Sequence, residues 1–445
     1  MGSLSVRGLT ARYGKTVALH GVDLDVADGE FFVILGPSGA GKTTTLKSVA
    51  GLVDAVEGEV RIGGVDMTGV EPYERNVAMA FESYALYPQK TVEQNLASPL
   101  RSGRTGSWSP AEQSERIRQV TTTLGIEHLR QRFPRELSNG QRQRTALGRV
   151  LVRPADVYLL DEPLSHLDAK LRAAMRAELK QLGEMSRTTT LYVTHDYQEA
   201  LALGDRVGVL REGRLVQVGT PREVWHEPAD TFVARMFGQP EMNLFEADLA
   251  AVPEGGTAAR SRRGGITVGV PASVAGSVAG SVAGGSVGGG AAGSVEGGAA
   301  GGSVLLGIRP RDLEVLAGPE PSDRLVLRGR VTLAERLGRL VELSVDVAGE
   351  AVIAVTDDQR VREGDPVSLA VPWERVHIFA GADLGAETGN GAGTAAARLG
   401  AGTALPPGTA AGGAGGVGKA PGTVAGGAVG KTPVVDASAT SGGAQ

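Results

Sequence analysis

The sequence predicts an α/β protein followed by a small β-barrel, and three observations lead to this fold class. A glycine-rich loop lies between an apolar strand and a helix near the start of the chain. A second apolar strand, much later, ends in two carboxylates. Short strand-like segments then follow one another to about residue 380. The first part is therefore expected to be a phosphate-loop NTPase core with antiparallel β and helical subdomains.

The composition excludes several classes of protein. A chain of 445 residues suggests about two or three domains. Its formal net charge of −5 argues against a general nucleic-acid binder, which is usually basic. The lack of cysteine excludes disulfides and thiolate metal sites. No signal peptide is visible in 1–19, and the apolar runs are shorter than the roughly 18 residues that cross a bilayer. A role at a membrane would therefore need a partner.

The glycine-rich loop carries the first chemical signal. The pattern G-x-x-x-x-G-K-[ST] is matched by Gly36-Pro37-Ser38-Gly39-Ala40-Gly41-Lys42-Thr43-Thr44. The apolar run 31–35 before it is typical of a buried strand, and 42–52 can continue as a helix. Glycine lets the backbone wrap around phosphate oxygens, and free N–H groups at the helix start point at the anion. Lys42 would reach the β- and γ-phosphates, and the Thr43 hydroxyl would ligate Mg²⁺. The alternative is a turn that only joins a strand to a helix.

Two later strands end in residues that suit the same chemistry. The strand 157–161 ends in Asp161, followed by Glu162. In phosphate-loop enzymes the first carboxylate holds Mg²⁺, and the second could activate water as a general base. The strand 190–196 carries His195 at its carboxyl end, the edge where open parallel sheets bind ligands. Solvated strand ends are the alternative, and the phosphate loop disfavours them.

Three further positions have weaker signals. Tyr13 lies in an exposed turn between strands and could stack on a base, although a lone tyrosine more often packs. Ser138 is placed as the N-cap of a helix that exposes its first N–H groups. Asp168 leads into an amphipathic helix. One face of that helix carries Leu171, Met175, Leu179 and Leu182, and another carries Arg172, Arg176 and Lys180.

The remaining chain changes character after residue 243. Strand-like segments lie at 244–249, 304–310, 325–331, 341–347, 352–355 and 367–371, a spacing that predicts an OB-like β-barrel within 238–380. A low-complexity insert is expected at 254–303, where 271–303 repeats Gly, Ser, Val and Ala. The Gly/Ala-rich tail 381–445 is expected to be disordered.

Together, the phosphate loop, the stretch 137–141, Asp161-Glu162, Asp168 and His195 resemble the ATP-binding-cassette (ABC) ATPases over residues 1–237. Other tracts resemble the ATPase subunits of bacterial carbohydrate importers, of the maltose and glycerol-3-phosphate type. These tracts are Tyr84-Ala85-Leu86-Tyr87-Pro88, Leu167-Asp168-Ala169-Lys170-Leu171-Arg172, Met242-Asn243-Leu244 and Gly307-Ile308-Arg309-Pro310. In that family a regulatory β-barrel follows the ATPase domain.

The resemblance implies a role for each matching position. Tyr13 would stack on adenine, and 36–44 would hold the phosphates of ATP. Asp161 would support Mg²⁺, while Lys42, Glu162 as base and His195 at the γ-phosphate would be the catalytic groups. A second ATPase chain, the same or a homologous one, would meet the first at Asp168. It would also receive Ser138, Asn139, Gly140 and Gln141 at its own ATP.

The resemblance also implies partners and a location. Two transmembrane permease subunits would bind the ATPase chains, with a coupling helix received near 82–95. An extracytoplasmic solute-binding protein would act indirectly. The chain would then sit peripherally on the cytoplasmic face of the cell membrane.

Two positions depart from the family pattern. Glu82 stands where the family usually has Gln, and Asn139 stands where it usually has Gly. Glu82 could still ligate Mg²⁺, but its charge opposes the γ-phosphate. Two alternatives therefore stay open beside carbohydrate import. One is an importer of a polyamine, a metal ion or an inorganic anion, and the other is a catalytically impaired, nucleotide-gated subunit.

Overall fold

The computed structural model describes residues 2–81, 85–101, 108–165, 167–252, 256–262, 267–270, 303–321 and 323–380. All of these belong to one compact unit, Met1–Gly389. Several expectations concern positions outside the described residues. They are Glu82, with the neighbouring Ser83 and Tyr84, the repeat 271–302 and the tail 381–445.

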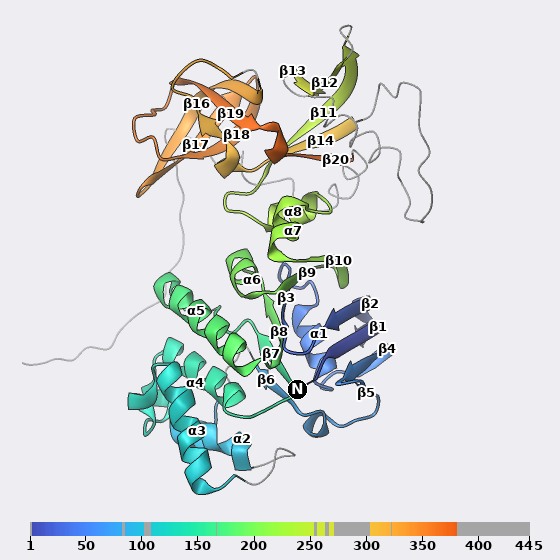
Figure 1. Cartoon of the computed structure of the whole chain (residues 1–445), viewed down its shortest axis with the longest axis vertical. Helices are drawn as coiled ribbons and strands as arrows, with labels where there is room; N and C mark the ends of the chain where they lie inside the picture. The colour runs from blue at the N-terminus through green and yellow to red at the C-terminus, as the bar shows by residue number, and fades with distance from the viewer. Residues whose placement is uncertain are drawn as a thin grey trace, which may run out of the picture. The chain divides into compact units, whose positions relative to one another are not determined.

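A six-stranded sheet is the centre of the first part of the chain, with the order β10-β9-β3-β8-β7-β6 (Figure 1). Neighbouring strands run parallel except at the β10 edge, which is antiparallel to β9. The strands are β3 Phe31–Leu35, β6 Val77–Ala80, β7 Val157–Asp161, β8 Thr189–Thr194, β9 Arg206–Arg211 and β10 Arg214–Gly219. The strands predicted at 31–35, 157–161 and 190–196 are thereby confirmed as β3, β7 and β8.

The sheet is buried on both faces, which explains why its strands are apolar runs and not alternating patterns. In β3, Phe31, Val33 and Leu35 pack into one hydrophobic cluster. Phe32 and Ile34 point to the other side and belong to a second cluster. Successive side chains of a strand point to opposite faces, so one short strand supplies two cores.

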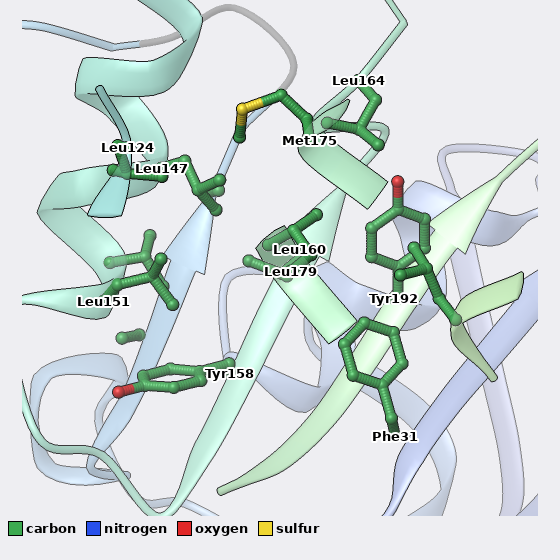
Figure 2. Close-up of a cluster of buried hydrophobic side chains, with 14 of the residues drawn as sticks. Phe31, Leu124, Leu147, Leu151, Tyr158, Leu160, Leu164, Met175, Leu179 and Tyr192 are labelled. Carbon is green, nitrogen blue, oxygen red and sulfur yellow. The ribbon is translucent and has the colours of Figure 1, made fainter. Parts of the chain in front are cut away.

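Helices cover the first face. Figure 2 shows side chains of α4 and α5 packed against the β3, β7 and β8 side chains Phe31, Tyr158, Leu160 and Tyr192. The helices that contribute to this cluster include α2 Val92–Arg101, α3 Pro110–Thr123, α4 Asn139–Leu151, α5 Ala169–Ser186 and α6 Tyr197–Leu203. The expected amphipathic face of α5 is confirmed at Met175 and Leu179, which are buried there. Among the described residues, no helix is long and apolar enough to cross a membrane.

The second face is covered by helix α1, Lys42–Val49, and by an antiparallel sheet of order β2-β1-β4-β5 (Figure 1). Its strands are β1 Leu4–Tyr13, β2 Thr16–Val26, β4 Ala55–Ile62 and β5 Val65–Asp66. Helix α1 is shorter than the predicted 42–52. Gly51, at φ +76°, lies so close to Arg75 that an added Cβ would be 2.5 Å from the guanidinium Nε.

Two short helices follow β10. They are α7 Pro221–His226 and α8 Thr231–Met236. Each has its own N-cap, because Thr220 accepts from Glu223 N and Asp230 accepts from Val233 N. Pro228 lies between them, and proline disfavours the helical conformation of the residue before it.

After Asn243 the described chain forms two five-stranded antiparallel sheets, ordered β13-β12-β11-β14-β20 and β15-β19-β16-β17-β18. Their inner faces share one hydrophobic core. The strands are β11 Asn243–Val252, β12 Gly256–Ser261, β13 Thr267–Val270, β14 Ser303–Ile308, β15 Glu314–Val315, β16 Arg324–Leu337, β17 Leu340–Val347, β18 Glu350–Thr356, β19 Pro366–Pro372 and β20 Val376–Ala380.

The expected low-complexity insert at 254–303 begins with two strands that the sequence did not indicate. Strands β12 and β13 both precede the repeat that starts at residue 271. The reason is pairing, since β12 continues a hairpin with β11, from Val252 opposite Gly256 to Ala247 opposite Ser261. A ladder of backbone hydrogen bonds satisfies the polar groups of such a strand.

Candidate active site

The order of the central sheet brings the candidate residues to one edge. Strands β3, β8 and β7 are adjacent and parallel. The phosphate loop follows β3, His195 follows β8, and Glu162 follows β7. Parallel strands present their carboxyl ends together, so residues far apart in the sequence meet there.

The phosphate loop depends on glycine at two points. Gly41 is the N-cap of α1 with φ +106°, a conformation that L side chains rarely adopt. At Gly36, an added Cβ would lie 2.5 Å from the Leu210 carbonyl oxygen of β9. The loop therefore curls tightly between β3 and α1 and leaves the start of α1 without a side-chain cap.

Lys42 lies inside this curl and is 5% exposed. Its ammonium donates to the carbonyl oxygens of Gly36 at 2.9 Å and Pro37 at 3.0 Å. It also lies 3.3 Å from Glu162 Oε1. Three oxygens thus fix one positive charge at the mouth of the loop, where a phosphate would be attracted.

Thr43 and Asp161 form a second pair at the same edge. The Thr43 hydroxyl donates to Asp161 Oδ1 at 2.9 Å, and Asp161 is 3% exposed. A hydroxyl and a carboxylate are hard oxygen ligands of the kind that Mg²⁺ prefers. The pair that the sequence predicts as metal ligands is therefore already in contact.

Glu162 has an unusual backbone for a residue with a side chain, with φ +43°. Its N–H donates to the Val193 carbonyl of β8 at 3.1 Å, which holds the turn in place. His195 Nδ1 lies 2.7 Å from Glu162 Oε2, so this N–H donates to the carboxylate. The carboxylate of Glu162 therefore lies between the Lys42 ammonium and the imidazole.

The sequence-predicted residues at the start of α4 form a separate group. Ser138 is the N-cap, and its hydroxyl accepts from Gln141 N at 3.3 Å. The Gln141 side chain accepts from Ser138 N at 2.9 Å, which completes a capping box. The Asn139 side chain accepts a bond from Arg142. These contacts stay within α4 and its cap, and they do not join this group to Lys42.

Two more candidates lie outside the Lys42 cluster. Asp168 is the N-cap of α5 and accepts from Leu171 N at 2.9 Å. Tyr13 is the last residue of β1 and is 49% exposed. Both side chains are accessible, as a role at a nucleotide or at a second chain requires.

Sequence reasoning missed the residues that hold the end of β8 next to His195. Thr194 Oγ1 and Tyr192 OH both donate to Glu199 Oε2, at 2.7 and 2.8 Å. Glu199 is 2% exposed, and burial raises the pKa of its carboxyl. Asp196 caps α6 by accepting from Gln198 N at 2.8 Å. Only that cap has a sequence signal, an aspartate directly before a helix.

Comparisons with known proteins agree with this geometry. A family model for ABC transporters matches residues 19–165, and one for the TOBE domain matches 306–379. An sn-glycerol-3-phosphate import ATP-binding protein of Rhizobium johnstonii is 40% identical over 86% of this chain and 96% of its own length. A trehalose/maltose import ATP-binding protein of Thermococcus litoralis is 40% identical over 82% and 94%. A xylose/arabinose import ATP-binding protein of Haloferax volcanii is 39% identical over 85% and 94%.

The chain therefore belongs to the ABC transporter family, with an ATP-binding cassette fold followed by an OB-like TOBE domain of antiparallel strands. Within this family it is an ATP-binding subunit, an ATPase whose activity is coupled to import.

Proposed function

We propose that this chain hydrolyses ATP for a carbohydrate importer, with sugar, oligosaccharide or glycerol phosphate as cargo. The contact of Glu162 with both Lys42 and His195, beside the Thr43–Asp161 pair, carries the proposal for hydrolysis. The cargo class is supported by the names of the relatives, which import sn-glycerol-3-phosphate, maltose, trehalose or pentoses. The ATPase domain would span 1–237, with a regulatory domain at 238–380.

The donor set fits ATP with Mg²⁺. The loop 36–44 offers backbone N–H groups and the Lys42 ammonium to phosphate oxygens. Thr43 and Asp161 would hold Mg²⁺, with Glu82 as a proposed further ligand. Bound Mg²⁺ would neutralise part of the negative charge of the phosphates. Tyr13 is proposed to stack on the adenine.

The residues at the strand ends would divide the remaining work. Glu162 would accept the proton of the attacking water, for which its carboxylate must be ionised. The Lys42 ammonium lies 3.3 Å from Glu162 Oε1. His195 would orient the Glu162 carboxylate through the Nδ1 contact and present the rest of its half-exposed ring to the γ-phosphate.

The second half of the site is proposed to come from another ATPase chain. The capping box satisfies Ser138 and Gln141 internally, while the start of α4 stays exposed. It would close on the ATP of the partner, with Asp168 at the contact. Gly140 and Asn139 would lie on this contact surface, where Asn139 adds an exposed side chain.

The membrane partners would be two transmembrane permease subunits, which would hold this chain on the cytoplasmic face of the cell membrane. An extracytoplasmic solute-binding protein would act through them. Their coupling helix is proposed to dock near 82–95. In the described part of that surface, buried Asn95 binds Tyr87 N and Tyr87 O at 2.9 and 3.1 Å. Lys90 and Arg149 lie over the Tyr87 ring, at 4.3 and 4.9 Å from its centroid. This ordered aromatic turn supports a docking role.

A steady-state ATPase assay of the assembled transporter tests the proposal. We expect hydrolysis that rises when the solute-binding protein presents a sugar or glycerol phosphate. A lack of hydrolysis in the complete assembly would favour the impaired, nucleotide-gated alternative. Stimulation only by a polyamine, a metal ion or an inorganic anion would reject the cargo class and keep the enzyme.

A further inference from the structure

Arg172, on the first turns of α5, joins two segments of the site that are distant in sequence. Its Nη1 donates to Asp196 Oδ2 at 3.1 Å, and its Nη2 donates to the Leu167 carbonyl at 3.1 Å. Leu167 precedes Asp168, and Asp196 directly follows His195. One planar guanidinium therefore ties the turn before α5 to the turn after β8.

We propose that Arg172 is a positioning residue that makes the Asp168 turn and His195 move as one unit. The inference rests on the two-chain site proposed above, in which Asp168 meets the second chain and His195 meets the γ-phosphate. Contact of Asp168 with the second chain would then favour the position of His195 that suits hydrolysis. Contact of His195 with the γ-phosphate would likewise favour the position of Asp168 that meets the second chain. Closure of the dimer and alignment of the imidazole would be coupled through this side chain.

The surroundings make the link stiff on both sides. The Asp168 turn begins at Glu162, whose carbonyl accepts from Ser165 N at 3.2 Å and Ser165 Oγ at 3.0 Å. On the other side, Asp196 N donates to Thr194 Oγ1 at 3.0 Å, and Thr194 is held by buried Glu199. A shift of either turn must therefore carry Arg172 with it or break its bonds.

The geometry favours arginine over lysine at this position. Arginine offers several donors in a fixed plane, so two acceptors in different segments can be bound at a defined separation. The side chain of Arg172 is 29% exposed and that of Asp196 is 17% exposed. The pair is therefore shielded more than a surface ion pair, whose contribution is usually small.

Arg172→Gln tests the link in the assembled transporter. We expect kcat to fall roughly tenfold while the KM for ATP changes less than about twofold, because the site stays intact but is aligned less often. The Hill coefficient for ATP should fall toward one. Arg176→Gln is the matched control, with the same charge change one turn further along α5 and no ion pair within the described residues.

Asp196→Asn breaks the same contact from the other side. Asparagine keeps the N-cap of α6, so the helix is retained. If the two residues act through one contact, the double variant should lose no more than the larger single loss. Additive losses, or an equal fall of kcat in Arg176→Gln, would overturn the inference. If Arg172→Gln does not fold, the cooperativity of Asp196→Asn decides alone, and unchanged cooperativity rejects the link.

The same assay separates this inference from the proposed function. An inactive wild type would reject the proposed function, and a fully active Glu162→Gln variant would reject the role of Glu162 as the base. A wild type that hydrolyses ATP, an inactive Glu162→Gln and an Arg172→Gln variant with normal cooperativity would reject only the coupling through Arg172.

Discussion

At the phosphate loop, Lys42 and Glu162 join residues that follow three different strands, whereas at the start of α4 the side chains satisfy one another. The first region is held together by tertiary contacts, and its ligand groups already face one another. The second is a local capping motif whose functional surface lies outward. This difference supports the proposal that one chain supplies the residues for phosphate and metal, and that a second chain completes the site.

The largest expected effect separates binding from chemistry within the first region. Glu162→Gln should keep ATP binding, because the neutral amide fills the same space beside Lys42. Turnover should fall about 10²- to 10⁴-fold, the usual cost of removing a general base. Single-turnover hydrolysis and equilibrium ATP binding measure the two quantities. Near-normal turnover would show that Glu162 is not the base.

A paired change sharpens the comparison between the two regions. Lys42→Ala should weaken ATP binding to the isolated chain, because it removes the buried cation. Gly140→Asp should leave that binding nearly unchanged and lower turnover of the assembled transporter roughly a hundredfold, since it adds a negative charge to the segment proposed to face the partner's ATP. Its Cβ would contact Leu167 Cδ2 at 3.1 Å, so thermal unfolding is the control. Loss of ATP binding by the isolated Gly140→Asp chain would contradict the proposal that the start of α4 takes no part in ATP binding by its own chain.

The smallest expected effect concerns Glu199, which binds Thr194 next to His195. Burial raises the pKa of Glu199 above its ordinary value of 4.5. As the pH rises from 4.5 through the raised pKa, the unfolded state loses this proton first, so Glu199 costs stability at higher pH. Glu199→Gln has no proton to lose. The urea midpoint of this variant relative to wild type should therefore increase between pH 4.5 and pH 8. A difference between the two urea midpoints that does not change with pH would contradict a raised pKa for Glu199.

The sequence predicted the parts of both regions that depend on local chemistry. Apolar runs indicated β3 and β7, and serine before a polar helical stretch indicated the cap at Ser138. It could not predict the backbone of Glu162, because its positive φ depends on a hydrogen bond to Val193 of another strand. The hydrogen bond from Arg172 to Asp196 could not be predicted either, because it also joins segments that are distant in the sequence. A charged face on a helix does not say which charges have partners.

Strands β12 and β13 are elements of the structure that the sequence did not indicate. Their composition, at 256–261 and 267–270, is low in bulky apolar residues. The backbone ladder with β11 orders them nonetheless. Pairing is a property of the assembled sheet, and the residues of one segment do not reveal it.

Photolabelling across a mixture of two chains tests the two-chain site most directly. An intact chain and a size-tagged Lys42→Ala chain are co-purified on the tag and given an ATP analogue with a photoreactive γ-phosphate. The tagged chain should bind the analogue too weakly to label itself, and labelling it alone is the control. The account predicts label on the tagged chain within Ser138–Gln141, carried by ATP seated in the intact partner. Label confined to the intact chain of the co-purified pair would contradict it.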